Sequence, residues 1–234
     1  MNVPKAILVG GGTGALGRAL VAAALDAGAR VAVPYRSTAE WDALVALARE
    51  PDRLFGAAAD LADPAAGERF VLAAVAAMGG LDGVAALAGA YAGSGPFEKS
   101  SADEWESMIR ANLGTAASLC RATLPHLLKG GGSVVTVGSR TAEAGGAGAA
   151  AYAVAKMGVI ALTRALAAEN RDRGVRFNCI SPGTIDTPAN RAAMPSADHR
   201  SWTPPAAIAR LILFLLSPDS APTTGAVLPA DGRG

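Results

Sequence analysis

The stretch Val9-Gly10-Gly11-Gly12-Thr13-Gly14-Ala15-Leu16-Gly17-Arg18 decides the fold of this 234-residue chain. It follows a short apolar run at residues 6–9 and leads into residues 15–27, which have the composition of a helix. Glycines between a strand and a helix permit a tight turn and let backbone N–H groups approach a pyrophosphate, which the helix N-terminus attracts. The stretch therefore predicts a strand–turn–helix unit that binds a dinucleotide; a structural turn without a ligand is the alternative.

Strand-like and helix-like segments alternate along the rest of the chain. Strands are expected at residues 6–9, 31–35, 54–59, 84–88, 132–137, 175–180 and 226–229, and helices at 15–27, 40–49, from 64 onward, within 103–129, at 150–173 and at 205–216. This alternation is typical of βαβ units with right-handed crossovers. We expect an α/β fold, a Rossmann-type doubly wound parallel sheet of about seven strands with helices on both faces. No linker, repeat or low-complexity segment divides residues 1–234, so one domain is predicted.

Composition narrows the class of protein. Apolar residues make up 51% of the chain and charged residues 18%, which fits a sheet buried on both faces. The net charge of +1 and the lack of a basic block indicate no nucleic-acid or membrane-surface partner. Cys120 and Cys179 lie in apolar contexts without metal-ligand spacing, so we predict buried thiols and no metal site. No signal peptide is apparent, and Asp82 and several glycines interrupt the weakly charged stretch 70–93, so a cytoplasmic protein without a membrane span is predicted.

A second motif places a phenol and an ammonium four residues apart, at Tyr152 and Lys156, with Ser139 upstream. In a helix, side chains at this spacing share a face. A free tyrosine, with a pKa of about 10, is a poor acid–base catalyst at neutral pH, and a neighbouring ammonium lowers that pKa. Ser139 ends an apolar run and is placed to hydrogen-bond a substrate oxygen beside the phenol. The three residues predict an acid–base site; a coincidental pair on an ordinary helix is the alternative.

The end of the second predicted strand, Val33-Pro34-Tyr35-Arg36-Ser37, bears on the choice of cofactor. A carboxylate at this place would bind the ribose 2′-hydroxyl of NAD, whereas an arginine accommodates the 2′-phosphate of NADP. The segment holds Arg36 and no acid, and the first acid that follows, Glu40, falls inside the next predicted helix. We therefore expect NADP(H) to be favoured over NAD(H), the alternative being that Arg36 is a solvated loop residue.

Taken in order, these motifs resemble the short-chain dehydrogenase/reductase family over nearly the whole chain. Residues 10–17 are similar to its turn Thr-Gly-x-x-x-[Ala/Gly]-x-Gly, and Ser139, Tyr152 and Lys156 resemble its Ser and Tyr-x-x-x-Lys. Residues 178–188 resemble the family's segment beside the nicotinamide, and residues 224–232 its closing strand and turn. The resemblance implies reversible hydride transfer between a nicotinamide and a carbonyl–alcohol pair, with a small molecule as the partner.

The resemblance also implies roles for single residues. Tyr152 would donate a proton to a developing alkoxide that Ser139 holds, while Lys156 lowers the tyrosine pKa and holds the nicotinamide ribose. Asn112 matches the family's further catalytic residue and would position a water that relays protons to Lys156. The implied catalytic residues are Ser139, Tyr152, Lys156 and Asn112. The implied cofactor-binding residues are Gly11, Thr13, Gly14, Ala15, Leu16, Gly17, Tyr35, Arg36, Asp60, Leu61, Ala88, Gly89, Tyr152, Lys156, Pro182, Gly183 and Ile185.

Two departures from the family pattern stand out. Gly10 replaces the leading threonine of the glycine turn, and Ala86-Leu87-Ala88-Gly89 replaces the family's Asn-Asn-Ala-Gly after the fourth strand. Losing the threonine hydroxyl and the two asparagine amides is expected to affect the rigidity of the turn and the affinity for the cofactor. The acid–base residues are intact.

The substrate is less well defined by the sequence. Residues 189–203 occupy the place of the family's substrate-covering loop, and their composition predicts a mobile lid with little intrinsic order. Small residues at 145–150 permit a bulky substrate, so 3-oxoacyl thioesters, sugars, steroid-like alcohols and xenobiotic ketones stay open. A pteridine reductase of the same family and a non-catalytic NADP-binding regulatory protein are the alternatives. Assembly through the two long helices, here 112–129 and 150–173, would give a homotetramer or dimer.

Overall fold

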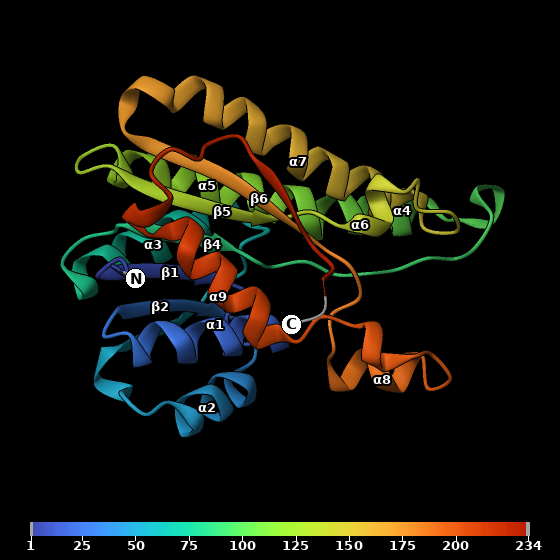
Figure 1. Cartoon of the computed structure of the whole chain (residues 1–234), viewed down its shortest axis with the longest axis horizontal. Coiled ribbons are helices and arrows are strands. Elements are labelled where there is room, and N and C mark those ends of the chain that lie inside the picture. The colour runs from blue at the N-terminus through green and yellow to red at the C-terminus, as the bar shows by residue number, and fades with distance from the viewer. Residues whose placement is uncertain (1, 233–234) are drawn as a thin grey trace.

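A computed structural model describes residues 2–232, and its centre is one parallel sheet (Figure 1). The sheet has seven strands in the order β3-β2-β1-β4-β5-β6-β7. They are β1 (Ala6–Gly10), β2 (Arg30–Tyr35), β3 (Leu54–Ala58), β4 (Gly83–Ala86), β5 (Gly132–Val137), β6 (Val175–Pro182) and β7 (Val227–Ala230). Because β1 pairs with both β2 and β4, the strand order reverses there and opens a crevice at their carboxyl ends. The predicted doubly wound sheet is confirmed.

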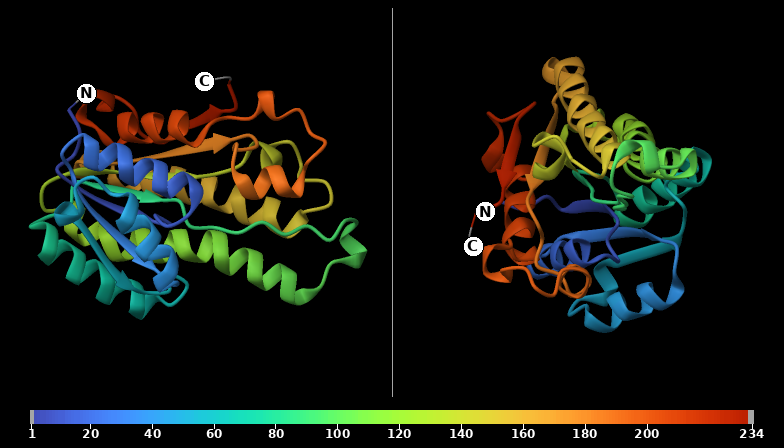
Figure 2. Two further views of the ribbon diagram at one scale, coloured as in Figure 1. Left: turned by 90° about the horizontal axis from the view of Figure 1, so that it is seen from below. Right: turned by 90° about the vertical axis from the view of Figure 1, so that its right-hand side faces the viewer.

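Two layers of helices cover the sheet (Figure 2). One layer contains α1 (Ala15–Asp26), α2 (Thr38–Leu47) and α9 (Pro205–Leu216). The other contains α3 (Pro64–Met78), α4 (Ala102–Met108), α5 (Thr115–Leu127) and α7 (Ala150–Asn170). Ile7 and Val9 of β1 face the first core and Leu8 the second, since side chains alternate along a strand. A strand buried on both faces reads as a continuous apolar run, which is why the sequence revealed these strands.

Shorter elements complete the chain. They are η1 (Pro51–Arg53), η2 (Phe97–Lys99), the π-helix η3 (Ile109–Gly114), α6 (Arg140–Glu143), η4 (Arg171–Arg173), α8 (Pro188–Ala193), η5 (His199–Ser201) and η6 (Pro218–Ser220). The helical region predicted within 103–129 is therefore divided by one π-helical turn. Other predicted boundaries fall within two residues of the observed ones, except that α7 ends three residues before the predicted end, where η4 continues the turn.

The prediction of little order across residues 189–203 is wrong for part of that segment. Helix α8 begins directly after Thr187, whose hydroxyl accepts a hydrogen bond from the Asn190 N–H at 3.1 Å. Pro188 occupies the first helical position, where its missing N–H costs nothing. A cap followed by proline is a helix-start signal that the composition of the segment concealed.

Two other features concern buried groups. Cys120 and Cys179 are both free and buried, as the sequence predicts. The helical span Ala150–Arg173 is long and apolar enough to cross a membrane, but it packs along β5 and β6. This packing buries 44% of its most apolar stretch and so accounts for part of its apolarity.

The first glycine of the turn, Gly10, leaves little room for a side chain. A Cβ at Gly10 would lie 2.7 Å from Leu119 Cδ2 and 3.0 Å from Leu61 Cδ1, and both leucines are buried. The space that the family's threonine would take is thus filled from the second core. This packing gives a physical reason for the departure at Gly10.

We predict that Gly10→Thr, which restores the family residue, lowers the free energy of unfolding by about 1–3 kcal/mol because it overpacks this core. Urea unfolding followed by circular dichroism measures the change. Gly14→Ala is the control, since a Cβ there meets only Gly11 O at 3.4 Å. Equal stability of Gly10→Thr and the parent protein would contradict the packing argument.

Candidate active site

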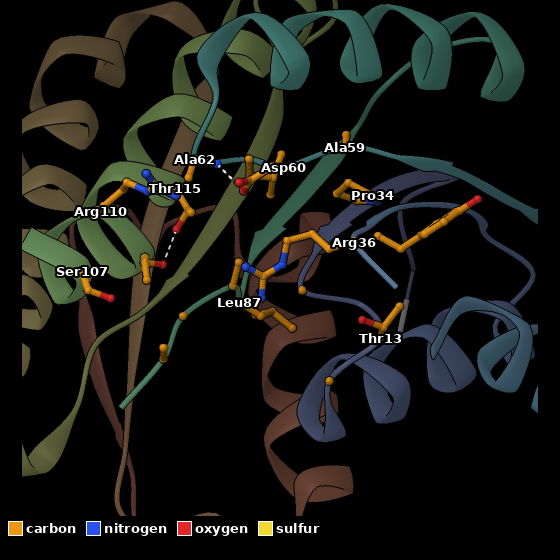
Figure 3. A pocket seen from close by; sticks show the side chains of 18 of the residues that line it. Thr13, Pro34, Arg36, Ala59, Asp60, Ala62, Leu87, Ser107, Arg110 and Thr115 are labelled. Carbon is orange, nitrogen blue, oxygen red and sulfur yellow. Dashed lines mark hydrogen bonds between the residues drawn. The ribbon is translucent and has the colours of Figure 1, made fainter. Parts of the chain in front are cut away.

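A cavity of about 740 Å³ opens at the carboxyl ends of β1 to β4 (Figure 3). Its walls come from the glycine turn, the end of β2, the loops after β3 and β4, and the region of α4 and η3. The structure brings more than half of the predicted cofactor residues to this one cavity. They are Gly11, Thr13, Gly14, Tyr35, Arg36, Asp60, Leu61, Ala88 and Gly89.

The glycine turn has the features of a pyrophosphate cradle. Gly11 has a φ of +82°, and a Cβ there would lie 2.8 Å from the backbone N of Ala88. Gly14 precedes α1 without a side-chain cap, so the first N–H groups of that helix are free to bind a ligand. A helix N-terminus beneath a glycine turn attracts phosphate oxygens. The residues present therefore fit a dinucleotide.

Charged side chains line the cavity on several sides. In Figure 3, Arg36 reaches toward the middle from the β2 side and Arg110 stands on the opposite wall. Asp60 turns one carboxylate oxygen back to accept the Ala62 N–H at 3.0 Å. Glu40 also lines the cavity, and its Oε2 accepts a hydrogen bond from Thr13 Oγ1 at 3.0 Å.

Sequence reasoning missed Glu40 and Arg110. Glu40 belongs to the next helix, as predicted, but it lies in the first turn of α2 and faces the cavity. The spacing of Ser37 and Glu40 is that of a capping box, a signal that could have placed Glu40 in the first turn of α2. Arg110 is the second residue of the π-helix, and no local pattern distinguishes it from other exposed arginines.

The remaining predicted cofactor residues do not line this cavity. Ala15, Leu16 and Gly17 form the start of α1, where a Cβ at Gly17 would overlap the carbonyl oxygen of Gly11. Pro182 ends β6, Gly183 follows it, and Ile185 bridges to Thr203. Gly17 thus acts on the packing of the turn, and the β6 residues belong to a separate region.

Gly89 joins the cavity to the predicted acid–base residues. A Cβ at Gly89 would lie 2.6 Å from Asn112 Oδ1 and 3.3 Å from Lys156 Nζ. Gly89 itself lines the cavity, whereas Asn112 and Lys156 are buried behind it. The two groups of predicted residues therefore meet at one point.

Ser139, Tyr152 and Lys156 come together from two elements. Ser139 is the residue before α6, just beyond the end of β5, and Tyr152 and Lys156 lie in the first two turns of α7. Ser139 lies close enough to Tyr152 for its side chain to interact with the phenol and lower the pKa of Tyr152. Lys156 Nζ lies 5.9 Å from the Tyr152 ring centre and donates to the carbonyl oxygen of Val137 at 3.1 Å. Such a cluster can hold an oxygen between two hydroxyls and exchange a proton with it.

The protonation of these residues differs from the sequence-based expectation. Burial raises the pKa of Tyr152, the Ser139 side chain opposes that change, and the neighbouring Tyr91 adds to it. Burial also lowers the pKa of Lys156 to about 8. The expected lowering of the Tyr152 pKa is therefore not found, because desolvation of the phenol outweighs the effects that favour the phenolate.

Asn112 stabilises the loop beyond β4. Its Nδ2 donates to the carbonyl oxygens of Ala90 and Met108, each at 3.0 Å, and its Oδ1 accepts the Ala90 N–H at 3.3 Å. Asn112 lies within the π-helix, a rare turn that is frequent at functional sites. Its amide thus ties the loop beyond β4 to the region of α4 and η3.

Two features beside this cluster were not foreseen. Tyr91 packs edge-on against Tyr152 with ring centres 5.0 Å apart, although 68% of Tyr91 is exposed. Near the end of β6, Ser181 Oγ donates to Glu143, Arg140 pairs with Glu143 at 2.9 Å, and Arg140 also pairs with Asp231 at 2.8 Å. The loop that carries Tyr91 has no periodicity, and Asp231 is 91 residues from Arg140, so no local signal predicts either contact.

Comparisons with known proteins agree with the fold and identify the family. A family model described as enoyl-(acyl carrier protein) reductase matches residues 12–232. The 2,5-dichloro-2,5-cyclohexadiene-1,4-diol dehydrogenase LinX of Sphingobium indicum is 33% identical over 239 residues, which cover 97% of this chain and 95% of LinX. The 3-oxoacyl-[acyl-carrier-protein] reductase FabG of Chlamydia pneumoniae is 36% identical over 141 residues, 56% of this chain and 57% of FabG.

Among solved structures, levodione reductase superposes with a TM-score of 0.92 at 28% identity, covering 99% of this chain and 98% of that one. The family match spans nearly all of the chain, and the named relatives are dehydrogenases and reductases. The chain therefore belongs to the short-chain dehydrogenase/reductase family, whose members are oxidoreductases that use NAD(P) on alcohol–carbonyl pairs.

Proposed function

We propose that this protein catalyses the NADPH-dependent reduction of a carbonyl to an alcohol, with Tyr152 as the proton donor. The main support is the position of the Ser139 side chain beside the Tyr152 phenol, with Lys156 one helical turn further along α7. When bound, the nicotinamide supplies the hydride, and the residues of this chain orient the carbonyl and move the proton.

The raised pKa of Tyr152 suits it to the reductive direction. Because burial keeps the phenol protonated at neutral pH, Tyr152 is ready to donate. Ser139 holds the carbonyl oxygen by a hydrogen bond as negative charge develops on it, and the phenol proton then passes to that oxygen. The Lys156 ammonium stabilises the phenolate that remains, and a water positioned by Asn112 returns the proton through Lys156.

The cofactor preference rests on Arg36. This exposed side chain lines the cavity and takes part in no ion pair among residues 2–232, so its charge is available to a 2′-phosphate. Around the glycine turn, Gly11, Thr13 and Gly14 would hold the pyrophosphate and Asp60 the adenine. Pro182, Gly183 and Ile185 would lie beside the nicotinamide, and Tyr152 and Lys156 would hold its ribose.

For the substrate, we propose a 3-oxoacyl thioester or a bulky ketone. LinX is named for a cyclic diol and FabG for a 3-oxoacyl carrier-protein thioester, so both relatives support a secondary alcohol or its ketone. The exposed ring of Tyr91 beside Tyr152 offers an apolar wall for such a molecule. We further propose that residues 1–234 form one cytoplasmic domain and assemble as a homotetramer or dimer. The exposed Val154 and Met157 on α7 are suited to that interface.

The first prediction about the proposed site concerns the proton donor. Tyr152→Phe should lower kcat about 10²–10⁴-fold, the contribution typical of a general acid, and leave NADPH binding within a few-fold of the parent. NADPH consumption is followed with a panel of ketones, 3-oxoacyl thioesters and quinonoid pterins. Tyr91→Phe is the matched control, since it removes a nearby phenol hydroxyl and keeps the ring. Near-normal turnover by Tyr152→Phe would refute the assignment, and turnover confined to pterins would favour a pteridine reductase.

The second prediction follows from the buried ammonium. The pKa of Lys156 is about 8 in the fold against 10.5 for the free side chain, so the fold carries the full electrostatic penalty below pH 8 and loses it as the pH rises toward 10.5. Lys156→Met should therefore raise the free energy of unfolding at pH 7. That gain should shrink by on the order of 2–3 kcal/mol between pH 7 and pH 10. Urea unfolding of both proteins across this range measures the difference, and a gain independent of pH would contradict the argument.

The third prediction concerns cofactor choice. Arg36→Ala should weaken NADPH binding about tenfold or more, the loss typical of a hydrogen bond to a charged group, and leave NADH binding almost unchanged. Titration of reduced-nicotinamide fluorescence measures both affinities. Arg49→Ala removes a guanidinium just beyond α2 that does not line the cavity, and serves as the control. Equal weakening of both cofactors by Arg36→Ala would mark Arg36 as a surface charge.

A further inference from the structure

Two opposite charges border the same end of the nucleotide cavity. Arg36 follows β2 and Glu40 lies in the first turn of α2, and both line the cavity together with Thr13 of the glycine turn. No ion pair joins Arg36 to Glu40 in the described part of the chain. Each charge is therefore free to act on a ligand that enters between them.

Glu40 is fixed in position by the glycine turn. Thr13 Oγ1 donates to Glu40 Oε2 at 3.0 Å, and the Glu40 N–H donates to Ser37 Oγ at 3.3 Å. Arg18 braces the same contact by donating from Nε to the carbonyl oxygen of Thr13 at 2.7 Å. The other carboxylate oxygen, Oε1, has no hydrogen-bond partner among residues 2–232. Glu40 thus keeps one free acceptor at the cavity wall.

The helix that carries Glu40 cannot easily turn away. Trp41, the next residue, stacks on Tyr35 with ring centres 5.2 Å apart and an interplanar angle of 13°. The Trp41 ring also fills the space above Gly56 of β3, where a Cβ would overlap it. The first turn of α2 is therefore anchored to the sheet on the side next to Glu40.

We propose that Glu40, held by Thr13, is a second determinant of cofactor choice and makes the site able to bind NAD(H) as well as NADP(H). The free Oε1 accepts a hydrogen bond from a ribose 2′-hydroxyl, which only NAD(H) carries. A 2′-phosphate gains from Arg36 but is repelled by the Glu40 carboxylate. The inference rests on the proposed placement of the ribose beside Arg36, and it limits the NADP preference that Arg36 alone would give.

Nicotinamide-free fragments test this idea without turnover. Isothermal titration calorimetry compares ADP-ribose, which has the 2′-hydroxyl, with 2′-phospho-ADP-ribose, which has the phosphate. Glu40→Gln should weaken ADP-ribose binding and tighten 2′-phospho-ADP-ribose binding, each by about three- to tenfold. Thr13→Val, which releases the carboxylate, should move the affinity ratio in the same direction by less.

Asp42→Asn is the matched control. It removes one negative charge from the same helix at an exposed position that does not line the cavity. A ratio that is unchanged in Glu40→Gln, or that moves equally in Asp42→Asn, would overturn the inference. If the affinity ratio shifts in Glu40→Gln but not in Arg36→Ala, the role of Glu40 is supported and the NADP preference proposed for Arg36 is rejected. A failure of this inference can therefore be told apart from a failure of the proposed function.

Discussion

Backbone contact at the glycine turn is the constraint on which the rest of the structure depends. Gly17 packs against the carbonyl of Gly11, and Gly11 packs against the backbone of Ala88, at distances that exclude a side chain. This contact sets the start of α1 beneath the cavity and the path of the loop after β4. Asn112 then holds the next residue of that loop, Ala90, through both halves of its amide. The nucleotide end and the acid–base end consequently share one wall at Gly89.

Some residues of the candidate active site lower the stability of the fold. Lys156 is an almost fully buried ammonium whose hydrogen bond to Val137 O does not offset its desolvation, and its pKa falls to about 8. The π-helical turn at Asn112 interrupts an otherwise regular helix, and such turns persist mainly where function retains them. Both lie behind Gly89, while the ordinary packing of α1 against α9 and of α3 against α5 is remote from them. Enzymes commonly have residues at the active site that lower the stability of the folded protein.

The sequence predicted what depends on local pattern. Apolar runs gave all seven strands, and the spacing of Tyr152 and Lys156 placed both on α7 with Ser139 nearby. Local pattern did not predict the features of the site that depend on contacts between distant segments. The raised pKa of Tyr152 comes from burial that no local pattern encodes, and the position of Glu40 depends on a hydrogen bond to Thr13. Helix α8 was not predicted for another reason: the mixed composition of residues 189–203 conceals the capping signal at Thr187 and Pro188.

The Arg140–Asp231 pair makes the carboxyl-terminal end of the described chain part of the site. Asp231 contacts Arg140 of α6, and a Cβ at Gly183 would lie 3.2 Å from the Cβ of Asp231. Thr203, the last residue of the segment 189–203, donates to the carbonyl oxygen of Ala230 at 3.1 Å. Chain ends usually tolerate trimming and fusion because they touch little. Here loss of Ala230 and Asp231 would remove the contacts that join this strand end to α6, to the turn after β6 and to Thr203.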